Sequence, residues 1–486
     1  MTIKNEIVLI TYPDSMGKNI KELTDILEVH FKDAIGGIHI LPFFPSTGDR
    51  GFAPLTYKEV DKKFGSWEDI ENLGKKYYLI YDFMINHISR SSEYFKDFIK
   101  NKDRSRYADM FIKFKDFWPE GKPTKEDIEL IYKRKPEPPC IEVKFDDGTT
   151  EKIWSTFGEE QVDLNVKAEV TREFIKDSLT YLAAKGASVI RLDAFGYTIK
   201  KAGTNCFFIE PDVWEILDYV QTILKPYDVE ILPEIHEHYS IQMKLAERGY
   251  WVYDFALPML VLHTLYNGSK KRLVSWLKQC PRKQFTTLDT HDGIGVVDVY
   301  DLLSDDEIEH VKENIFSKET YVKNLYNLTT TYKNFDIYQI NCTYYSALGN
   351  NDDAYLLARA IQFFAPGIPQ VYYVGLLAGE NDIELLEATK EGRNINRHYY
   401  TREEIEENLQ RPVIRKLLNL MKFRNAYPAF NGDFKVVEDG DDCLLTVLWQ
   451  KGKYETKLQA NLRTYKFSIT YFDPEVKKHV VLEDIQ

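Results

Sequence analysis

Four short clusters of charged and polar residues hold the side chains best suited to catalysis. They lie at 82–87, 191–194, 234–236 and 288–292, each at the end of a short apolar run. Two carboxylates on facing strands suit the cleavage of a glycosidic bond, because one attacks the anomeric carbon and the other protonates the leaving oxygen. A third acidic group can stabilise the cationic transition state. The clusters therefore favour glycosidic chemistry, with Asp193, Glu234 and Asp292 as the candidate carboxylates.

Arg191 and Asp193 form the most suggestive pair. They are two residues apart, so on a strand their side chains face the same side. A neighbouring guanidinium favours the ionised carboxylate, which is the form that a nucleophile needs. A buried ion pair without any chemistry would give the same pattern, so the pair alone leaves both explanations open.

The other candidates also have structural explanations. Glu234 follows Pro233 and an apolar run, a setting that suits a proton donor. A glutamate at a strand end can equally form a surface salt bridge. His291 and Asp292 would serve as a turn cap, and His87 as a core histidine with its hydrogen bonds satisfied. The residues together indicate a carbohydrate-active enzyme without excluding these alternatives.

The elements that must position these residues alternate between apolar strands and amphipathic helices. We predict strands at 7–10, 37–41, 78–82, 188–192, 230–234, 252–255, 285–289 and 370–373. Continuous apolar strands imply burial on both faces, and strand–helix repetition implies a parallel sheet. We therefore predict an α/β fold, a (β/α)₈ TIM barrel with the candidate residues at the carboxyl ends of its strands. A doubly wound open sheet is the alternative, but the sequence has no Gly-rich phosphate turn after the first strand.

Two connections are too long for simple loops and predict insertions after strands 3 and 7. We expect barrel segments at 1–87, 169–293 and 351–430, an inserted domain B at 88–168 and an inserted domain B′ at 294–350. The tail, 431–486, alternates apolar and polar residues, which predicts a small C-terminal β domain.

Composition narrows the classes of function. The net charge of −13 disfavours nucleic acid and anionic membranes as partners. The chain has no run of about 20 apolar residues, and its first residues do not have the pattern of a signal peptide. The 5 cysteines are scattered and show no metal-binding spacing. We expect a cytoplasmic protein with reduced thiols, without a membrane or nucleic-acid partner.

Five longer motifs resemble those of the sucrose phosphorylases, a family within the α-amylase superfamily. They are GDRGFAP at 48–54, TLDTHDGIGV at 287–296, NCTYYSAL at 341–348, PGIPQVYY at 366–373 and GRNINRHYY at 392–400. The resemblance also includes the four clusters, covers nearly the whole chain and weakens after about Asp433.

The resemblance implies a role for each matching position. It makes Asp193 the nucleophile, Glu234 the general acid/base and Asp292 the transition-state stabiliser. The implied substrate-binding residues are Asp49 and Arg397 at the glucosyl 4-hydroxyl region, His87 and His291 at other glucose hydroxyls, Arg191 beside the nucleophile, Phe52 as an aromatic platform, and Tyr197, His236, Tyr338 and Gln339 around the acceptor. Either Arg134 or Lys135 matches an acceptor-site arginine.

The implied reaction converts sucrose and phosphate into α-D-glucose 1-phosphate and D-fructose with retention of configuration. The partners would be these small molecules alone, and the chain would act as a monomer or homodimer. No cofactor and no metal are expected, although Asn86 matches a calcium ligand of the superfamily's amylases.

Four other functions stay open. The nearest is the same reaction on sucrose 6′-phosphate, whose enzymes tend to have a histidine at the position of Tyr338. The others are a phosphorylase of glucosylglycerol or glucosylglycerate, a hydrolase such as an amylase, and a non-catalytic barrel that only binds sugar.

Overall fold

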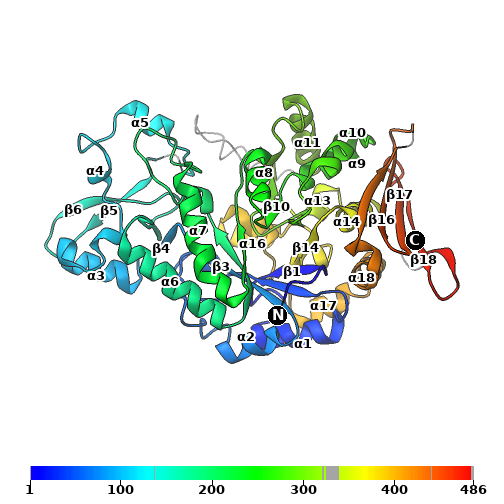
Figure 1. The fold of residues 1–486 in the computed structure, drawn as a ribbon, viewed down its shortest axis with the longest axis horizontal. Helices are drawn as coiled ribbons and strands as arrows, with labels where there is room; N and C mark the ends of the chain where they lie inside the picture. The colour runs from blue at the N-terminus through cyan, green and yellow to red at the C-terminus, as the bar shows by residue number, and fades with distance from the viewer. Residues whose placement is uncertain (1, 136, 320–321, 324–338, 439, 483–486) are drawn as a thin grey trace. The chain divides into compact units, whose positions relative to one another are not determined.

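The computed structural model describes the chain except residues 1, 136, 320–321, 324–338, 439 and 483–486 (Figure 1). The chain divides into two compact units, which are described separately. The first consists mainly of Ile40–Ile235, and the second of Ile3–His39, His236–Thr330 and Ile337–Gln486.

All eight predicted strands are present. They are β1 (Val8–Thr11), β2 (Gly37–Ile40), β3 (Tyr78–Met84), β8 (Ala187–Asp193), β9 (Glu230–Pro233), β10 (Val252–Asp254), β11 (Gln284–Thr286) and β14 (Ile368–Tyr372). Their hydrogen-bonded order is β10-β11-β14-β1-β2-β3-β8-β9. Every residue of β3 is buried, as expected for a strand covered on both faces. The predicted barrel is confirmed in place of the doubly wound alternative.

The first unit holds β3, β8 and β9 as parallel neighbours, with Arg191 opposite both Asp82 and Leu232. Its helices are α2 (Trp67–Gly74), α3 (Glu93–Asn101), α4 (Phe114–Phe117), α5 (Lys125–Leu130), α6 (Glu169–Ala184) and α7 (Asp212–Leu224). Helices α6 and α7 pack side by side (Figure 1).

Two small antiparallel sheets lie in the same unit, β4 (His87–Ser89) with β7 (Gln161–Asp163) and β5 (Cys140–Lys144) with β6 (Thr150–Trp154). An aromatic cluster that includes Phe114, Trp118 and Trp154 forms a core for this part of the chain. The boundaries of the two inserted domains remain predictions.

The second unit contains most of the helices that the structure describes. They are α1 (Ile20–His30), α8 (Tyr239–Glu247), α9 (Leu257–Asn267), α10 (Lys271–Gln279), α11 (Asp305–Lys318), α13 (Tyr344–Ala347), α14 (Asp352–Phe364), α15 (Tyr373–Leu376), α16 (Ile383–Thr389), α17 (Arg402–Asn408) and α18 (Pro412–Ala426). In α1 the buried residues are Ile20, Leu23, Ile26 and Leu27, one face of a helix, and the Asn19 side chain caps its first turn. A short antiparallel pair, β12 (Ile294–Gly295) with β13 (Gln339–Ile340), follows the candidate residue Asp292 in this unit.

The C-terminal segment of the second unit forms a five-stranded antiparallel sheet. Its strands are β15 (Asp433–Val437), β16 (Leu444–Lys451), β17 (Tyr454–Asn461), β18 (Phe467–Asp473) and β19 (Lys478–Val481), paired in chain order. Trp449 donates a hydrogen bond of 2.8 Å to the carbonyl of Phe364 at the end of α14. The predicted C-terminal β domain is confirmed. None of the helices in the described part of the chain combines the length and apolar character that crossing a membrane requires.

Candidate active site

A buried arginine organises the carboxylates of the first unit. Arg191 Nη1 lies 2.5 Å from Asp82 Oδ1 and 2.9 Å from Asp193 Oδ1. Its Nη2 lies 3.7 Å from Glu234 Oε1. Arg191 is 3% exposed and Asp82 is fully buried. A guanidinium that faces three carboxylates away from water keeps each of them oriented, and leaving any of them unpaired would be costly.

The backbone after Asp193 also faces Glu234. The N–H of Ala194 donates a hydrogen bond of 3.0 Å to Glu234 Oε2. Ala194 has a φ of 52°, in the left-handed region that residues with a Cβ seldom occupy. Strain of this kind is typical of functional sites. The structure therefore brings Asp193 and Glu234 together through two shared contacts, one from Arg191 and one from the strained turn.

Phe52 and His87, two of the predicted substrate-binding residues, lie next to one another. His87 Nε2 lies 2.9 Å from the carbonyl oxygen of Phe52, and Gln161 Nε2 donates to the same oxygen at 3.0 Å. The guanidinium of Arg191 lies 5.9 Å from the centroid of the Phe52 ring. Burial lowers the pKa of His87. The ring is therefore neutral at pH 7, and Nε2 carries its proton toward the Phe52 carbonyl.

Asp49 precedes this group in a strained turn. Asp49 and Arg50 have φ values of 42° and 47°, and Gly51 has a φ of 113°. A Cβ on Gly51 would lie 2.6 Å from the carbonyl oxygen of Pro42, so the turn requires glycine. The negative charge of Asp49 is one of the influences that raise the pKa of His87 against the effect of burial, which places Asp49 near that histidine.

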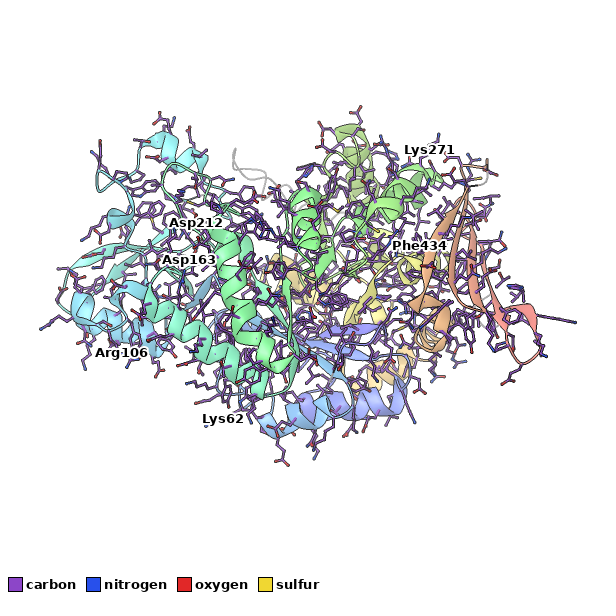
Figure 2. All side chains as sticks on the ribbon, in the orientation of Figure 1. Lys62, Arg106, Asp163, Asp212, Lys271 and Phe434 are labelled. Atoms are coloured by element: carbon purple, nitrogen blue, oxygen red, sulfur yellow. The ribbon has the colours of Figure 1, made fainter. Side chains whose placement is uncertain are left out.

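A buried ammonium stabilises the segments around His87. Lys200 Nζ donates to Asn86 Oδ1 at 2.5 Å and to the carbonyl of Tyr197 at 2.6 Å, and pairs with Asp163 Oδ2 at 2.6 Å. Asp163, whose place is labelled in Figure 2, is fully buried. Burial by itself would raise the pKa of Asp163, but Lys200 lowers it below its ordinary value. Asn86, which matches a calcium ligand in amylases, therefore faces a lysine ammonium here.

Replacing Lys200 by methionine is expected to lower the free energy of unfolding by about 3–5 kcal/mol, because Asp163 would be left buried without its counter-charge. Chemical denaturation measures the change. Lys201→Met, at an exposed neighbouring position, serves as the matched control. A loss below about 1 kcal/mol in the Lys200 variant, the range of a surface ion pair, would contradict the buried role.

Three consecutive basic residues, Lys133, Arg134 and Lys135, form a basic cluster in which Arg134 packs against aromatic side chains. Arg134 Nε hydrogen-bonds the hydroxyl of Tyr197. Its guanidinium lies 4.9 Å from the Tyr132 ring centroid and 5.3 Å from that of Tyr197. Lys135 Nζ lies 3.4 Å from Ser155 Oγ, and burial lowers the pKa of Lys135. The cluster is therefore not a freely solvated loop, and Arg134 is the member in contact with Tyr197.

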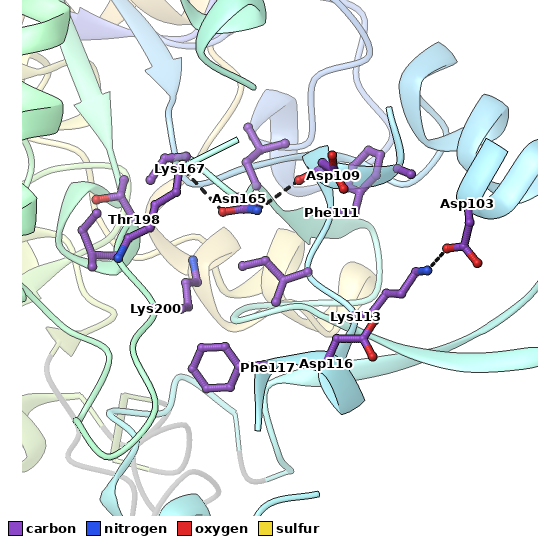
Figure 3. A pocket seen from close by; sticks show the side chains of 15 residues that line it. Asp103, Asp109, Phe111, Lys113, Asp116, Phe117, Asn165, Lys167, Thr198 and Lys200 are labelled. Carbon is purple, nitrogen blue, oxygen red and sulfur yellow. Dashed lines mark hydrogen bonds and ion pairs between the residues drawn. The ribbon is translucent and has the colours of Figure 1, made fainter. Parts of the chain in front are cut away.

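A cavity of about 390 Å³ lies in the same unit (Figure 3). Three lysines line it, and each of them is ion-paired. Lys113 pairs with Asp103, Lys167 lies 2.7 Å from Asp212, and Lys200 is held as described above. These pairs neutralise the cations that line the cavity, so Arg134 is a better candidate for binding an anionic acceptor.

Asp292 lies in the second unit among positive groups. His291 Nε2 is 3.3 Å from Asp292 Oδ2, Arg393 Nη1 is 3.0 Å from Oδ1, and Arg397 Nη2 is 3.9 Å from Oδ1. Burial alone would raise the pKa of Asp292, but His291, Arg393 and Arg397 lower it well below its ordinary value. The carboxylate is therefore ionised at any pH at which the protein would work, as a stabiliser of positive charge must be.

The loop that carries Asp292 is fixed from several sides. Arg359 on α14 pairs with Asp289 at 2.8 Å, and both side chains are buried. Asn396 Nδ2 donates to the carbonyl of Thr290 at 3.1 Å. Gly293 has a φ of 110°, and a Cβ there would lie 2.4 Å from the carbonyl oxygen of Ile340, so only glycine fits.

The structure describes all of the predicted site residues except one. The first unit contains Asp49, Phe52, His87, Arg134, Lys135, Arg191, Asp193, Tyr197 and Glu234, and the second contains His236, His291, Asp292, Gln339 and Arg397. Tyr338 lies outside the described residues.

Several residues of the site were not predicted from the sequence. Asp82 and Arg393 stand inside the quoted motifs, and their charge next to a candidate carboxylate was a usable signal. Gln161, Lys200 and Tyr12 carry no such signal. The Tyr12 ring contacts His291 edge-on, with 6.0 Å between the ring centroids.

Comparison with known proteins places this arrangement among carbohydrate-active enzymes. Residues 27–412 match the family model described as "Alpha amylase, catalytic domain". The chain is 54% identical to a sucrose phosphorylase of Streptococcus mutans, over 98% of the chain and 99% of that protein. It is 48% identical to a sucrose 6(F)-phosphate phosphorylase of Thermoanaerobacterium thermosaccharolyticum, over 97% of the chain and 98% of that protein. The crystal structure of sucrose 6F-phosphate phosphorylase from Thermoanaerobacter thermosaccharolyticum aligns with a TM-score of 0.94 and 46% identity, over 99% of both chains.

Proposed function

Since this chain belongs to the alpha-amylase family, we propose that it transfers the glucosyl group of sucrose to phosphate, releasing α-D-glucose 1-phosphate and D-fructose. The observation that carries the proposal is that Arg191 contacts both Asp193 and Glu234 and so holds them next to one another. The chain is also 54% identical to a sucrose phosphorylase. A nucleophile next to an acid/base is the arrangement that a retaining glucosyl transfer requires.

In the first step, Glu234 protonates the oxygen that joins glucose to fructose while Asp193 attacks the anomeric carbon. The bond to fructose breaks and a covalent glucosyl–enzyme forms with inverted configuration. Arg191 holds Asp193 in place, and Asp292 stabilises the positive charge that develops on the sugar ring. The neutral His87 is proposed to hydrogen-bond a hydroxyl of the glucose.

In the second step, phosphate attacks the same carbon and Glu234 accepts its proton. The bond to Asp193 breaks, and the second inversion restores the α configuration. Water competes with phosphate for this step, so the enzyme needs a cationic acceptor site. We assign that role to Arg134, whose guanidinium is stacked on Tyr132 and Tyr197, with His236, Tyr338 and Gln339 as further acceptor-site residues.

Phosphorolysis of sucrose 6′-phosphate is the second candidate, because a relative with that name is 48% identical over 97% of the chain. The enzyme is proposed to act on small molecules alone, without a cofactor or metal, as a monomer or homodimer in the cytoplasm.

A product assay tests the proposal. The protein is incubated with sucrose or sucrose 6′-phosphate, each with and without phosphate, and α-glucose 1-phosphate and free glucose are measured. We expect α-glucose 1-phosphate from sucrose only when phosphate is present. Free glucose alone would reject phosphorolysis, and turnover restricted to sucrose 6′-phosphate would favour the second candidate.

Arg134→Ala is expected to raise the KM for phosphate about 10- to 100-fold, the effect of losing one or two charge-assisted hydrogen bonds. Steady-state kinetics with varied phosphate measure the change. Lys133→Ala removes the same charge from the adjacent position and is the matched control. An equal rise in both variants would show that only the net charge of the loop matters.

A further inference from the structure

His236 and Asp298 form a histidine–aspartate pair in the second unit. His236 Nδ1 is 3.5 Å from Asp298 Oδ2. The His236 ring also stacks on Phe255, with 3.9 Å between the ring centroids and 19° between the planes. His236 is 7% exposed and Asp298 is fully buried. The imidazole is therefore held on one face by an aromatic ring and on one edge by a carboxylate.

The pair lies within electrostatic range of Asp292. Burial raises the pKa of Asp292, and His291, Arg393, Arg397 and His236 are the neighbours that lower it. His236 is thus close to a proposed catalytic carboxylate within one unit of the fold. Asp298 lies three residues beyond Gly295 in the sequence and contacts His236, which links it to the surroundings of Asp292.

The burial of Asp298 has a cost that simple packing does not explain. Its Oδ1 has no hydrogen-bond partner among the residues that the structure describes. Burial raises its pKa, and the contact with His236 opposes this effect. An unsatisfied buried oxygen costs about 1–3 kcal/mol. Unsatisfied groups of this kind in a folded protein call for an explanation, and a functional role is a common one.

The local backbone accommodates this carboxylate. A Cβ on Gly295 would lie 2.5 Å from Asp298 Oδ2, so any larger residue at this position would displace the oxygen that faces His236. The glycine thus leaves space for the histidine–aspartate contact, next to the loop that carries Asp292.

We propose that Asp298 is a positioning residue that orients His236 toward the phosphate acceptor and so favours phosphate over water. The inference rests on the proposed function and on the acceptor role of His236. Because Nδ1 faces Asp298, a hydrogen bond from the ring to phosphate must come from Nε2. A carboxylate behind a histidine fixes the orientation and tautomer of the ring and stabilises its positive charge, as in hydrolase triads and metal sites. An imidazole N–H that is held in one orientation binds a phosphate oxygen more strongly than a mobile one.

Asp298→Asn tests this role, since asparagine keeps the size of the side chain and removes its charge. We expect the KM for phosphate to rise about tenfold and the ratio of glucose 1-phosphate to free glucose to fall about tenfold, whereas the KM for sucrose changes much less. Asp301→Asn is the matched control. Asp301 Oδ2 lies 3.0 Å from His238 Nε2, and its side chain is 82% exposed, so we expect its loss to change neither quantity.

A double-mutant cycle separates positioning from a structural effect. If Asp298 acts through His236, then His236→Asn combined with Asp298→Asn will raise the KM for phosphate no further than His236→Asn alone. Additive losses, an unchanged KM for phosphate in Asp298→Asn, or an equal rise of both KM values would overturn the inference. Unmodified protein that releases only free glucose would reject the proposed function and this inference together. If the unmodified protein carries out phosphorolysis and Asp298→Asn has the same KM for phosphate and the same product ratio, the inference alone is rejected.

Discussion

Asp193→Asn is expected to lower kcat/KM for sucrose at least about 10⁴-fold, because an amide cannot form the glucosyl–enzyme ester. The fold should persist, since Arg191 keeps its contact with the buried Asp82. Initial rates of fructose release measure the loss, and circular dichroism measures the fold.

Asp212→Asn is the matched control for this variant. Asp212, labelled in Figure 2, lies in the same unit and also pairs with a cation, Lys167, at 2.7 Å. We expect its activity to stay close to that of the unmodified protein. If Asp193→Asn kept even a tenth of the turnover, another residue would have to be the nucleophile.

Glu234→Ala is expected to lower turnover of sucrose about 10²- to 10⁴-fold, because the fructosyl oxygen is a poor leaving group without a proton donor. α-Glucosyl fluoride should be affected far less in the first step, since fluoride leaves without protonation. Fluoride release in a single turnover, compared with fructose release from sucrose, measures the difference.

Glu230→Ala is the control for the Glu234 variant. Glu230 begins the same strand, β9, but is exposed. Equal losses on both substrates in Glu234→Ala would mean that the carboxylate acts on something other than the leaving group.

The barrel strands could be predicted because continuous apolar runs indicate burial on both faces. The C-terminal sheet could be predicted because its residues alternate between apolar and polar. Strand β11 is an instructive exception. The prediction extended it over 285–289, whereas the strand ends at Thr286. Asp289 is charged, and its burial depends on Arg359, which pairs with it from 70 residues further along the chain. A run of sequence letters does not reveal such a partner, so the point where the chain leaves the strand was placed too late.

Candidate site residues could be identified from the sequence where a residue type and its neighbours indicate the chemistry. Arg191, Asp193 and Asp292 stand beside residues whose charge is informative. Lys200 could not be found in this way, since its partners Asn86 and Asp163 are distant in the sequence and meet it only in the fold. Asp298 was missed for the same reason, because its contact with His236 spans 62 residues.

The measurement that tests the central claim most directly is the identification of the covalent intermediate. Glu234→Ala is incubated with α-glucosyl fluoride, quenched in acid and analysed by peptide mass mapping. We predict a single glucosyl group on Asp193, and in the unmodified protein we predict its transfer to phosphate as α-glucose 1-phosphate. A glucosyl group on another residue, or a β-configured product, would contradict the mechanism.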